Sequence, residues 1–150
     1  MYKLNFPDYS FRVEKQEGKL KIFDAVRKKF VVLTPEEWVR QHVLKYLNEE
    51  KKIPISLMAV EKEINYNNQK KRFDVLIYNS KAKPVFMVEC KSPEVEILQD
   101  VFNQLAVYNS LYGVDFLLVT NGIKHFCCKL NHQTNTYDFI KEIPSYNELI

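Results

Sequence analysis

Two acidic residues and a lysine stand at the ends of two strongly apolar segments. Asp74 lies near the start of segment 72–78, whereas Glu89 and Lys91 lie at the end of segment 84–90 and just beyond it. Apolar residues fill nearly every position of both segments, which is typical of central strands covered on both faces of a sheet. If the segments pair as an antiparallel hairpin, the three charged residues gather at one end of it.

The loop of this predicted hairpin sets its register. With residues 80–83 as a four-residue loop, Tyr78 lies opposite Val85 and Asp74 lies opposite Glu89. Directly opposed side chains point to the same face of a sheet, with their Cβ atoms about 5 Å apart. The sequence therefore predicts two carboxylates side by side on adjacent strands.

Facing carboxylates repel each other, and burial increases the repulsion. A divalent cation relieves it, and Mg²⁺ binds through one or two carboxylates, water and substrate phosphate. Lys91 follows Glu89 by two residues and shares its face, so its ammonium can orient a water or help to deprotonate it. These are the parts of metal-assisted phosphodiester hydrolysis. The alternative is that Asp74 and Glu89 are solvated strand-end charges that Lys91 neutralises.

An amphipathic helix precedes the hairpin. Thr34 is a good N-cap, Pro35 suits the first helical position, and Glu37 completes a capping box. Apolar residues then recur at every third or fourth position until about residue 50, as expected of a helix with one buried face.

The remaining elements follow from shorter patterns. We expect a hairpin at 20–23 and 30–33, a strand at 57–64, a second helix at 95–112, and strands at 115–120, 124–129 and 136–140, with a turn at Asn121-Gly122. This order predicts an α/β fold of three layers, in which helices flank a central mixed β-sheet. Residues 1–18 are expected to form an N-terminal arm and residues 19–150 a single domain.

Composition excludes several classes of protein. The chain has 150 residues, a net charge of +3, three glycines and three histidines. Walker A, GxGxxG and GxSxG loops and an HExxH zinc site are all absent. The mild positive charge permits a polyanionic partner without requiring one. Because no signal segment and no run of about 18 apolar residues occurs, we expect a cytoplasmic protein without membrane contact.

The three cysteines do not indicate a disulfide framework, because their number is odd and no signal segment precedes them. Cys127 and Cys128 lie close to His125, which raises the question of a zinc site. Adjacent strand residues point to opposite faces of a sheet, so these two thiols cannot easily share a tetrahedral metal. Buried, reduced thiols are the expected state.

Five segments, taken in order, resemble the N-terminal domain of the type I restriction enzyme R subunit, a member of the PD-(D/E)XK nuclease superfamily. The resemblance covers about residues 19–130, and Asp74 follows Phe73 where the superfamily signature has proline. The segments are Leu33–Gln41, Lys71–Asp74, Val88–Pro93, the pair Gln104 and Tyr108, and Val119–Gly122.

The resemblance implies a restriction-endonuclease-like fold and a Mg²⁺-dependent (or Mn²⁺-dependent) DNA endonuclease. In that family, the residues equivalent to Asp74 and Glu89, together with the backbone carbonyl of Cys90, hold the metal. Lys91 then acts on the water. The resemblance further implies that Gln104 and Tyr108 line the catalytic cleft; the alternative is a core tyrosine with an incidental glutamine.

The family also uses a helical glutamate upstream of the strands, which here is Glu36 or Glu37. Glu36 lies three residues before Val39 and seven before Val43, on the stripe that faces the sheet. We therefore assign Glu36 to the metal site and Glu37 to the helix cap. The alternative is that both are acids favoured by the helix dipole.

Two further groups of charges need an interpretation. Lys70, Lys71 and Arg72 precede Asp74 and are candidates for contacts to DNA phosphates, although a solvated turn explains them nearly as well. Glu61 and Glu63 are interpreted as solvated charges on an edge strand.

The leading hypothesis is therefore a metal-dependent endonuclease domain acting on DNA, as a homodimer or within a larger restriction or defence complex. The contrasting hypothesis is a catalytically silent nucleic-acid-binding or interaction module of the same fold. A purely structural domain is a third possibility, which the clustered acids disfavour. The complete set of predicted site residues favours the enzyme.

Overall fold

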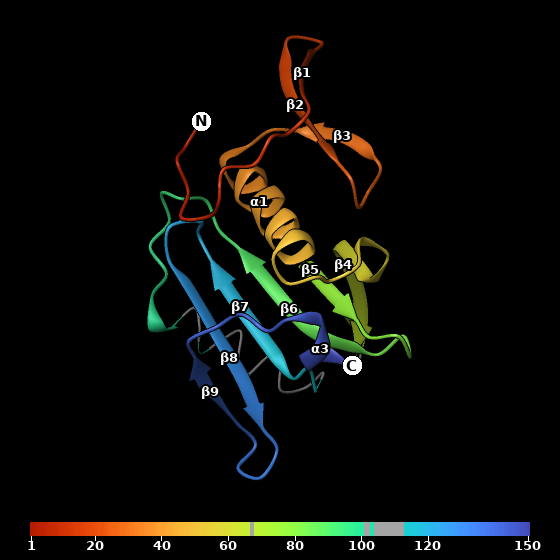
Figure 1. The fold of residues 1–150 in the computed structure, drawn as a ribbon, viewed down its shortest axis with the longest axis vertical. Helices are drawn as coiled ribbons and strands as arrows, with labels where there is room; N and C mark the ends of the chain where they lie inside the picture. Colours follow the sequence, from red (N-terminus) through yellow and green to blue (C-terminus); the bar gives the residue numbers. More distant parts are fainter. Residues whose placement is uncertain (67, 101–102, 104–112) are drawn as a thin grey trace.

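A mixed β-sheet forms the centre of the molecule (Figure 1). The computed structural model describes residues 1–66, 68–100, 103 and 113–150. Six of the described strands form this sheet in the order β4-β5-β6-β7-β8-β9, and the β6–β7 pair is parallel whereas the other neighbours are antiparallel. The strands are β4 (Met58–Tyr66), β5 (Gln69–Tyr78), β6 (Pro84–Cys90), β7 (Phe116–Thr120), β8 (His125–Asn131) and β9 (Thr136–Ile140).

A second, smaller sheet lies at the N-terminal end of helix α1 (Pro35–Glu49) (Figure 1). It consists of β1 (Val13–Gln16), β2 (Lys19–Asp24) and β3 (Lys29–Val32), paired antiparallel. The hairpin predicted around the basic turn is thus confirmed. The predicted boundary between arm and domain at residue 18 falls inside the β1–β2 hairpin.

Helix α1 covers one face of the large sheet (Figure 1). Its start is the predicted one, because the Glu37 N–H donates to Thr34 Oγ1 at 3.0 Å. The predicted capping box is only half formed, since the Glu37 carboxylate binds other side chains. Val39, Val43 and Leu47 are almost completely buried against the sheet, which accounts for the apolar stripe in the sequence.

Both faces of the central strands of the large sheet are buried, as the continuous apolar runs predict. Val75 and Ile77 pack in the cluster on the α1 side, whereas Leu76 belongs to a second cluster. Cys127 and Cys128 are divided between these same two clusters and are reduced. The prediction of buried thiols that point to opposite faces is confirmed.

The β5–β6 register agrees with the prediction over three pairs and then shifts. Val75 pairs with Val88 as predicted, but Tyr78 lies opposite Pro84 rather than Val85, because an irregularity follows Ile77. The cause is the loop, in which Asn79 Oδ1 accepts from the N–H groups of residues 81 and 83. At the other end, the last regular pair stops one residue short of Asp74 and Glu89.

Residues 1–12 contain no strand but are held in place. The Asn5 N–H donates to the Gly122 carbonyl at 2.7 Å, and Trp38 Nε1 donates to the Tyr2 carbonyl at 2.8 Å. Gly122 has a φ of +86°, and a Cβ there would lie 2.7 Å from a methyl carbon of Leu4. The turn at residues 121–124 therefore needs glycine for its conformation and for this close approach.

The second predicted helix is only partly covered by the described residues. Residues 95–98 are not helical, and helical conformation begins at Gln99 rather than at Val95. The described residues also form two short helices, the 3₁₀-helix η1 (Ile55–Leu57) and the α-helix α3 (Tyr146–Leu149). None of the described helices is long and apolar enough to cross a bilayer.

Candidate functional site

The carboxylate of Asp74 is held from two sides where β5 and β6 begin to separate. Its Oδ2 accepts from the Cys90 N–H at 2.7 Å, and its Oδ1 accepts from Arg40 Nη2 at 3.2 Å. One donor thus comes from the neighbouring strand and the other from α1. The backbone of Cys90, whose carbonyl is a predicted metal ligand, lies next to this carboxylate.

Glu89 and Lys91 lie beside Asp74. Lys91 Nζ is 3.4 Å from Glu89 Oε1, and the Lys91 N–H donates to the carbonyl of Thr120 on β7 at 2.8 Å. Burial and the nearby charge of Asp74 raise the pKa of Glu89 to about 7, although Lys91 opposes the shift. The predicted repulsion between two neighbouring acids is therefore present in the folded chain.

Glu36 and Glu37 differ sharply in their surroundings. Glu37 is buried, and its carboxylate accepts from Arg40 Nη1 (2.6 Å), Arg27 Nη2 (2.8 Å) and Gln41 Nε2 (3.0 Å). The Glu36 side chain is 46% exposed and contacts only Arg40, at 3.4 Å, among the ion pairs of the described residues. This arrangement favours Glu36 over Glu37 as the helical acid of the site.

Electrostatics place Glu36 in the same group as the strand acids. Burial and the charge of Asp74 raise the pKa of Glu36, whereas Arg40 and Lys91 oppose the rise. The charge of Glu36 also contributes to the raised pKa of Glu89. The structure thus brings together four of the predicted site residues: Glu36, Asp74, Glu89 and Lys91.

Two arginines of this region were missed by the sequence interpretation. Arg40 is 4% exposed and contacts Glu37 and Asp74. Arg27, in the β2–β3 turn, contacts Asp24 at 2.6 Å as well as Glu37. A partial signal exists for Arg40, since it follows Glu36 by four residues and Glu37 by three. Nothing in the sequence indicates that Arg27 joins them.

Glu61 is not the solvated edge charge that the sequence predicts. In the β4–β5 register it falls opposite Asp74, and its φ of +54° is uncommon for a glutamate. Its carboxylate lies 3.7 Å from both Arg27 and Arg40 and also binds Arg72. The acid therefore belongs to the charge network beside the site.

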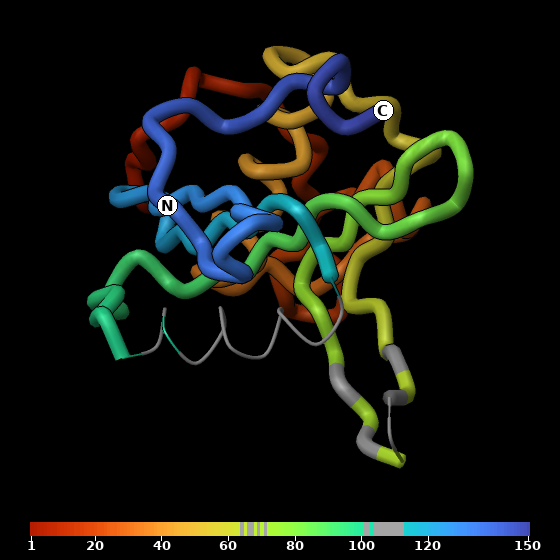
Figure 2. Tube along the Cα trace, turned by 90° about the horizontal axis from the view of Figure 1, so that it is seen from below, coloured from red at the N-terminus to blue at the C-terminus, as the bar shows by residue number. Residues whose placement is uncertain are grey.

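The predicted DNA contacts lie on the β4–β5 hairpin, which projects from the body of the molecule (Figure 2). Lys70 is exposed, and the Arg72 side chain is 66% exposed while paired with Glu61. The side chain of Lys71 lies outside the described part. Gln104 and Tyr108, predicted to line the cleft, lie outside the described residues.

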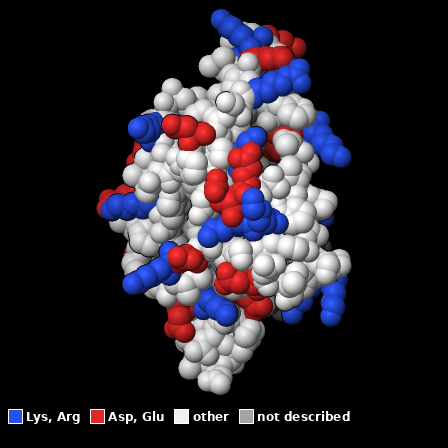
Figure 3. Space-filling view, in the orientation of Figure 1, with Lys and Arg blue, Asp and Glu red and all other residues white. Residues whose placement is uncertain are grey.

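The acids do not form a ready-made ligand cage. Among the described residues, no group of three or more histidine, cysteine, aspartate or glutamate side chains is arranged to hold a metal. Between Glu36 and Asp74 lies the guanidinium of Arg40, which contacts both. On the face seen in Figure 3, positive and negative side chains are intermixed and form no large area of one sign.

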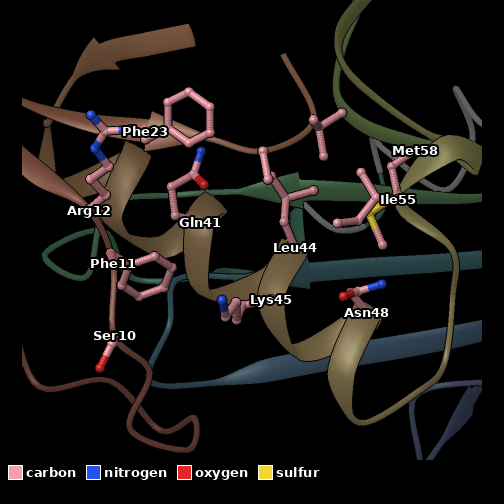
Figure 4. Close-up of a pocket in the computed structure, with 12 residues that line it drawn as sticks. Ser10, Phe11, Arg12, Phe23, Gln41, Leu44, Lys45, Asn48, Ile55 and Met58 are labelled. Atoms are coloured by element: carbon pink, nitrogen blue, oxygen red, sulfur yellow. The ribbon is translucent and has the colours of Figure 1, made fainter. Parts of the chain in front are cut away.

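A cavity of about 310 Å³ lies between α1, the small sheet and residues 10–12 (Figure 4). Gln41 lines this cavity and also donates to Glu37, so the cavity adjoins the charge network. Its lining contains no acid and cannot supply oxygen ligands of the kind that Mg²⁺ prefers. The lining residues are Ser10, Phe11, Arg12, Phe23, Ala25, Val26, Gln41, Leu44, Lys45, Asn48, Ile55 and Met58.

Two solved structures share this fold. One is a fragment of a protein assigned as the HsdR subunit of a type I restriction enzyme from Vibrio vulnificus YJ016, with a TM-score of 0.57, 20% identity and 78% of this chain covered. The present chain spans 24% of that protein. The other is a protein assigned as a DUF820 nuclease from Anabaena variabilis ATCC 29413, with a TM-score of 0.51, 11% identity, and 92% and 84% of the two chains covered.

These likenesses confirm the predicted α/β, restriction-endonuclease-like fold with its central mixed sheet. No curated protein matches the chain. The family described as type I restriction enzyme R protein N terminus (HSDR_N) matches residues 35–144, which is most of the sequence. The matched region begins at α1 and includes every strand of the large sheet. The chain therefore belongs to the family of type I restriction enzyme R protein N-terminal domains.

Proposed function

We propose that this chain is a metal-dependent nuclease domain that hydrolyses phosphodiester bonds of DNA. The observation that carries the proposal is the gathering of Glu36, Asp74, Glu89 and Lys91 at one end of the central sheet. Neighbouring carboxylates that are partly removed from water repel each other, and a bound divalent cation relieves that repulsion. Family membership and the nuclease-like fold support the same conclusion.

The donor chemistry of the site fits Mg²⁺ or Mn²⁺. Its side-chain oxygens are those of carboxylates, and burial together with the charge of Asp74 raises the pKa of Glu89 to about 7. Glu36, Asp74, Glu89 and the carbonyl of Cys90 would hold the ion. When bound, it would polarise the scissile phosphate and lower the pKa of a water.

The chain's own residues then have distinct tasks. Lys91 Nζ, 3.4 Å from Glu89 and one-third exposed, would donate to the attacking water, orient it and favour its deprotonated form. Lys70, Lys71 and Arg72 lie on the projecting hairpin that leads into Asp74, where cationic side chains would bind DNA phosphates and fix the strand over the acids.

The partners of the chain are part of the proposal. The HsdR protein that it resembles is much longer, so a role as the nuclease domain of a larger restriction or defence complex is proposed by analogy. The homodimer and the cytoplasmic location stay predictions.

A second candidate function is a nucleic-acid-binding module without catalysis. It is favoured by one observation: Arg40 lies between Glu36 and Asp74, and the described acids form no ligand cage. In this case the arginine would replace the metal permanently, and the hairpin would still bind DNA.

One experiment separates the two functions. Purified protein is incubated with supercoiled and with single-stranded DNA in Mg²⁺, in Mn²⁺ and in chelator, and DNA binding is measured in Ca²⁺. The nuclease proposal expects cleavage in Mg²⁺ or Mn²⁺ and none in chelator. DNA binding in Ca²⁺ without cleavage in any metal would establish the silent module instead.

A further inference from the structure

One nitrogen of Arg40 lies among three carboxylates. Its Nη2 is 3.2 Å from Asp74, 3.4 Å from Glu36 and 3.7 Å from Glu61, while its Nη1 is 2.6 Å from Glu37. The side chain is almost completely buried, and its Nε has no hydrogen-bond partner among the described residues. A buried guanidinium is tolerated only where acids compensate it, so its location is tied to theirs.

Asp74 receives one donor on each oxygen, and the donors come from opposite directions. The Cys90 N–H binds Oδ2 and Arg40 binds Oδ1. Two donors from different elements fix both the position and the plane of a carboxylate. Each oxygen accepts more than one contact, so both remain able to bind a metal ion.

We propose that Arg40 is the positioning residue of the site, which holds the Asp74 carboxylate in the orientation needed for metal ligation. The inference rests on the proposed function, in which Asp74 is a metal ligand. Arg40 acts through Asp74, which it contacts at 3.2 Å. Mutation of a group that orients a metal ligand in this way commonly lowers metal affinity or activity by roughly 10- to 100-fold.

Arg40 is itself held by the small sheet. Arg27 in the β2–β3 turn is fixed by Asp24, whose carboxylate also accepts from the N–H groups of Val26 and Arg27. Arg27 and Arg40 bind the same oxygen of Glu37. The contacts therefore run without a break from the turn, through Arg27, Glu37 and Arg40, to Asp74. Arg27 thus reaches Arg40 through Glu37, whereas Arg40 contacts Asp74 directly.

The geometry calls for arginine in particular. Separate nitrogens of the guanidinium reach Glu37 and Asp74, which lie on α1 and β5. A lysine carries the same charge on a single nitrogen and lacks this planar fork. Arg40→Lys therefore keeps the charge of the site but releases one of the two acids.

The test compares Arg40→Lys with Arg27→Lys, a matched control that also contacts Glu37 but does not reach Asp74. Mn²⁺ affinity is measured by calorimetry, DNA cleavage is separated into kcat and KM, and urea unfolding verifies that each variant is folded. Arg40→Gln is a second variant, in case the lysine is not accommodated.

We expect Arg40→Lys to lower Mn²⁺ affinity and kcat by roughly 10- to 100-fold while KM for DNA changes little. Arg27→Lys should stay within about threefold of wild type in Mn²⁺ affinity. Equal losses of Mn²⁺ affinity in the two variants would show a structural role for the whole network and overturn the proposal. Wild-type Mn²⁺ affinity in folded Arg40→Lys and Arg40→Gln would also overturn it.

The Mn²⁺ measurement also separates the two proposals. If the wild-type protein binds Mn²⁺ but does not cleave DNA, the nuclease proposal fails, and the role of Arg40 is judged on Mn²⁺ affinity alone. If Asp74→Asn has the same Mn²⁺ affinity as the wild-type protein, both proposals are overturned.

Discussion

Two groups of charged residues lie on either side of Arg40, and they differ in how fully their charges are compensated. In the network around Glu37, every carboxylate oxygen has a cationic or amide donor. In the group around Asp74 and Glu89, the acids share Arg40 and Lys91, and burial together with the charge of Asp74 keeps the pKa of Glu89 well above its ordinary value. The first arrangement stabilises the fold, whereas the second is the group to which the proposed function assigns the cation.

Glu36 and Glu37 show the difference most clearly, because adjacent residues of one helix belong to different groups. Position on the helix decides it: Glu37 faces the small sheet and its Arg27, whereas the half-exposed Glu36 lies toward Asp74 and Lys91. The fully paired charge of Glu37 contributes to folding. The partly paired charge of Glu36 is the one that the proposed function assigns to metal binding.

The largest expected effect is the loss of function in Asp74→Asn. The Cys90 N–H and Arg40 bind different oxygens of Asp74, and an amide offers them an N–H₂ group in place of one oxygen. The amide also lacks the negative charge of a carboxylate ligand. Mn²⁺ binding and DNA cleavage should both fall below detection, as measured by calorimetry and by nicking of supercoiled DNA. Asp138→Asn, an exposed acid on β9, is the control and should behave as wild type.

Glu37→Gln and Glu36→Gln should separate folding from function. Removing the Glu37 charge leaves Arg27 and Arg40 under-compensated in a buried region, and we expect a loss of about 3 kcal/mol in the free energy of unfolding. Because Glu36 is half exposed, Glu36→Gln should lower the free energy of unfolding by less than about 1 kcal/mol. It should nevertheless weaken Mn²⁺ binding more than Glu37→Gln does. Urea unfolding gives the free energy of unfolding of both variants, and calorimetry gives their Mn²⁺ affinity. Equal losses in the free energy of unfolding would contradict the distinction between Glu36 and Glu37.

Local patterns in the sequence were sufficient for much of this architecture. The apolar runs predict β5 and β6 and their pairing at Val75 and Val88, because burial on both faces leaves a continuous hydrophobic segment. The stripe on α1 predicts that Glu36 faces the sheet, but Glu37 is the buried acid and Glu36 is half exposed, so the assignment of Glu36 to the metal site stays a prediction. Together these patterns place the acids of the candidate site near one another.

The contacts that complete the site depend on distant parts of the chain. Arg27 and Glu61 meet Arg40 only after the small sheet and β4 have folded around α1, and no local periodicity encodes that meeting. The shift at Tyr78 arises from side-chain hydrogen bonds of Asn79 within the loop. Such three-dimensional features cannot be predicted from spacing alone.

Lys91→Ala tests whether the group around Asp74 and Glu89 takes part in catalysis in addition to binding the metal. The change removes no metal ligand, so DNA and metal should still bind while cleavage falls by roughly 10²-fold, the scale of one positioned acid–base group. Binding is measured in Ca²⁺ and cleavage in Mg²⁺, with Lys81→Ala in the exposed β5–β6 loop as the control. Cleavage at the wild-type rate would show that Lys91 only neutralises its neighbours.

The smallest expected effect is a pH dependence of stability in the metal-free protein. The pKa of Glu89 is about 7 in the folded chain against an ordinary value of 4.5. Between these pH values the folded state binds a proton that the unfolded state releases, so stability falls as pH rises from 4.5 to 7 and stays low above 7. In chelator at pH 8, Glu89→Gln should therefore be more stable than wild type, by on the order of 1–3 kcal/mol, and the two should converge near pH 4.5.

Glu63→Gln, a change at an exposed acid on β4, is the control for this experiment and should keep the wild-type pH dependence. Saturating Mg²⁺ at pH 8 should then raise the stability of wild type and not that of Glu89→Gln, because a ligand stabilises only the form that binds it. If Mg²⁺ stabilises both proteins equally, the acid beside Asp74 is not a metal ligand. In that case the network around Glu37 and the group around Asp74 and Glu89 would differ in how fully their charges are paired, but not in function.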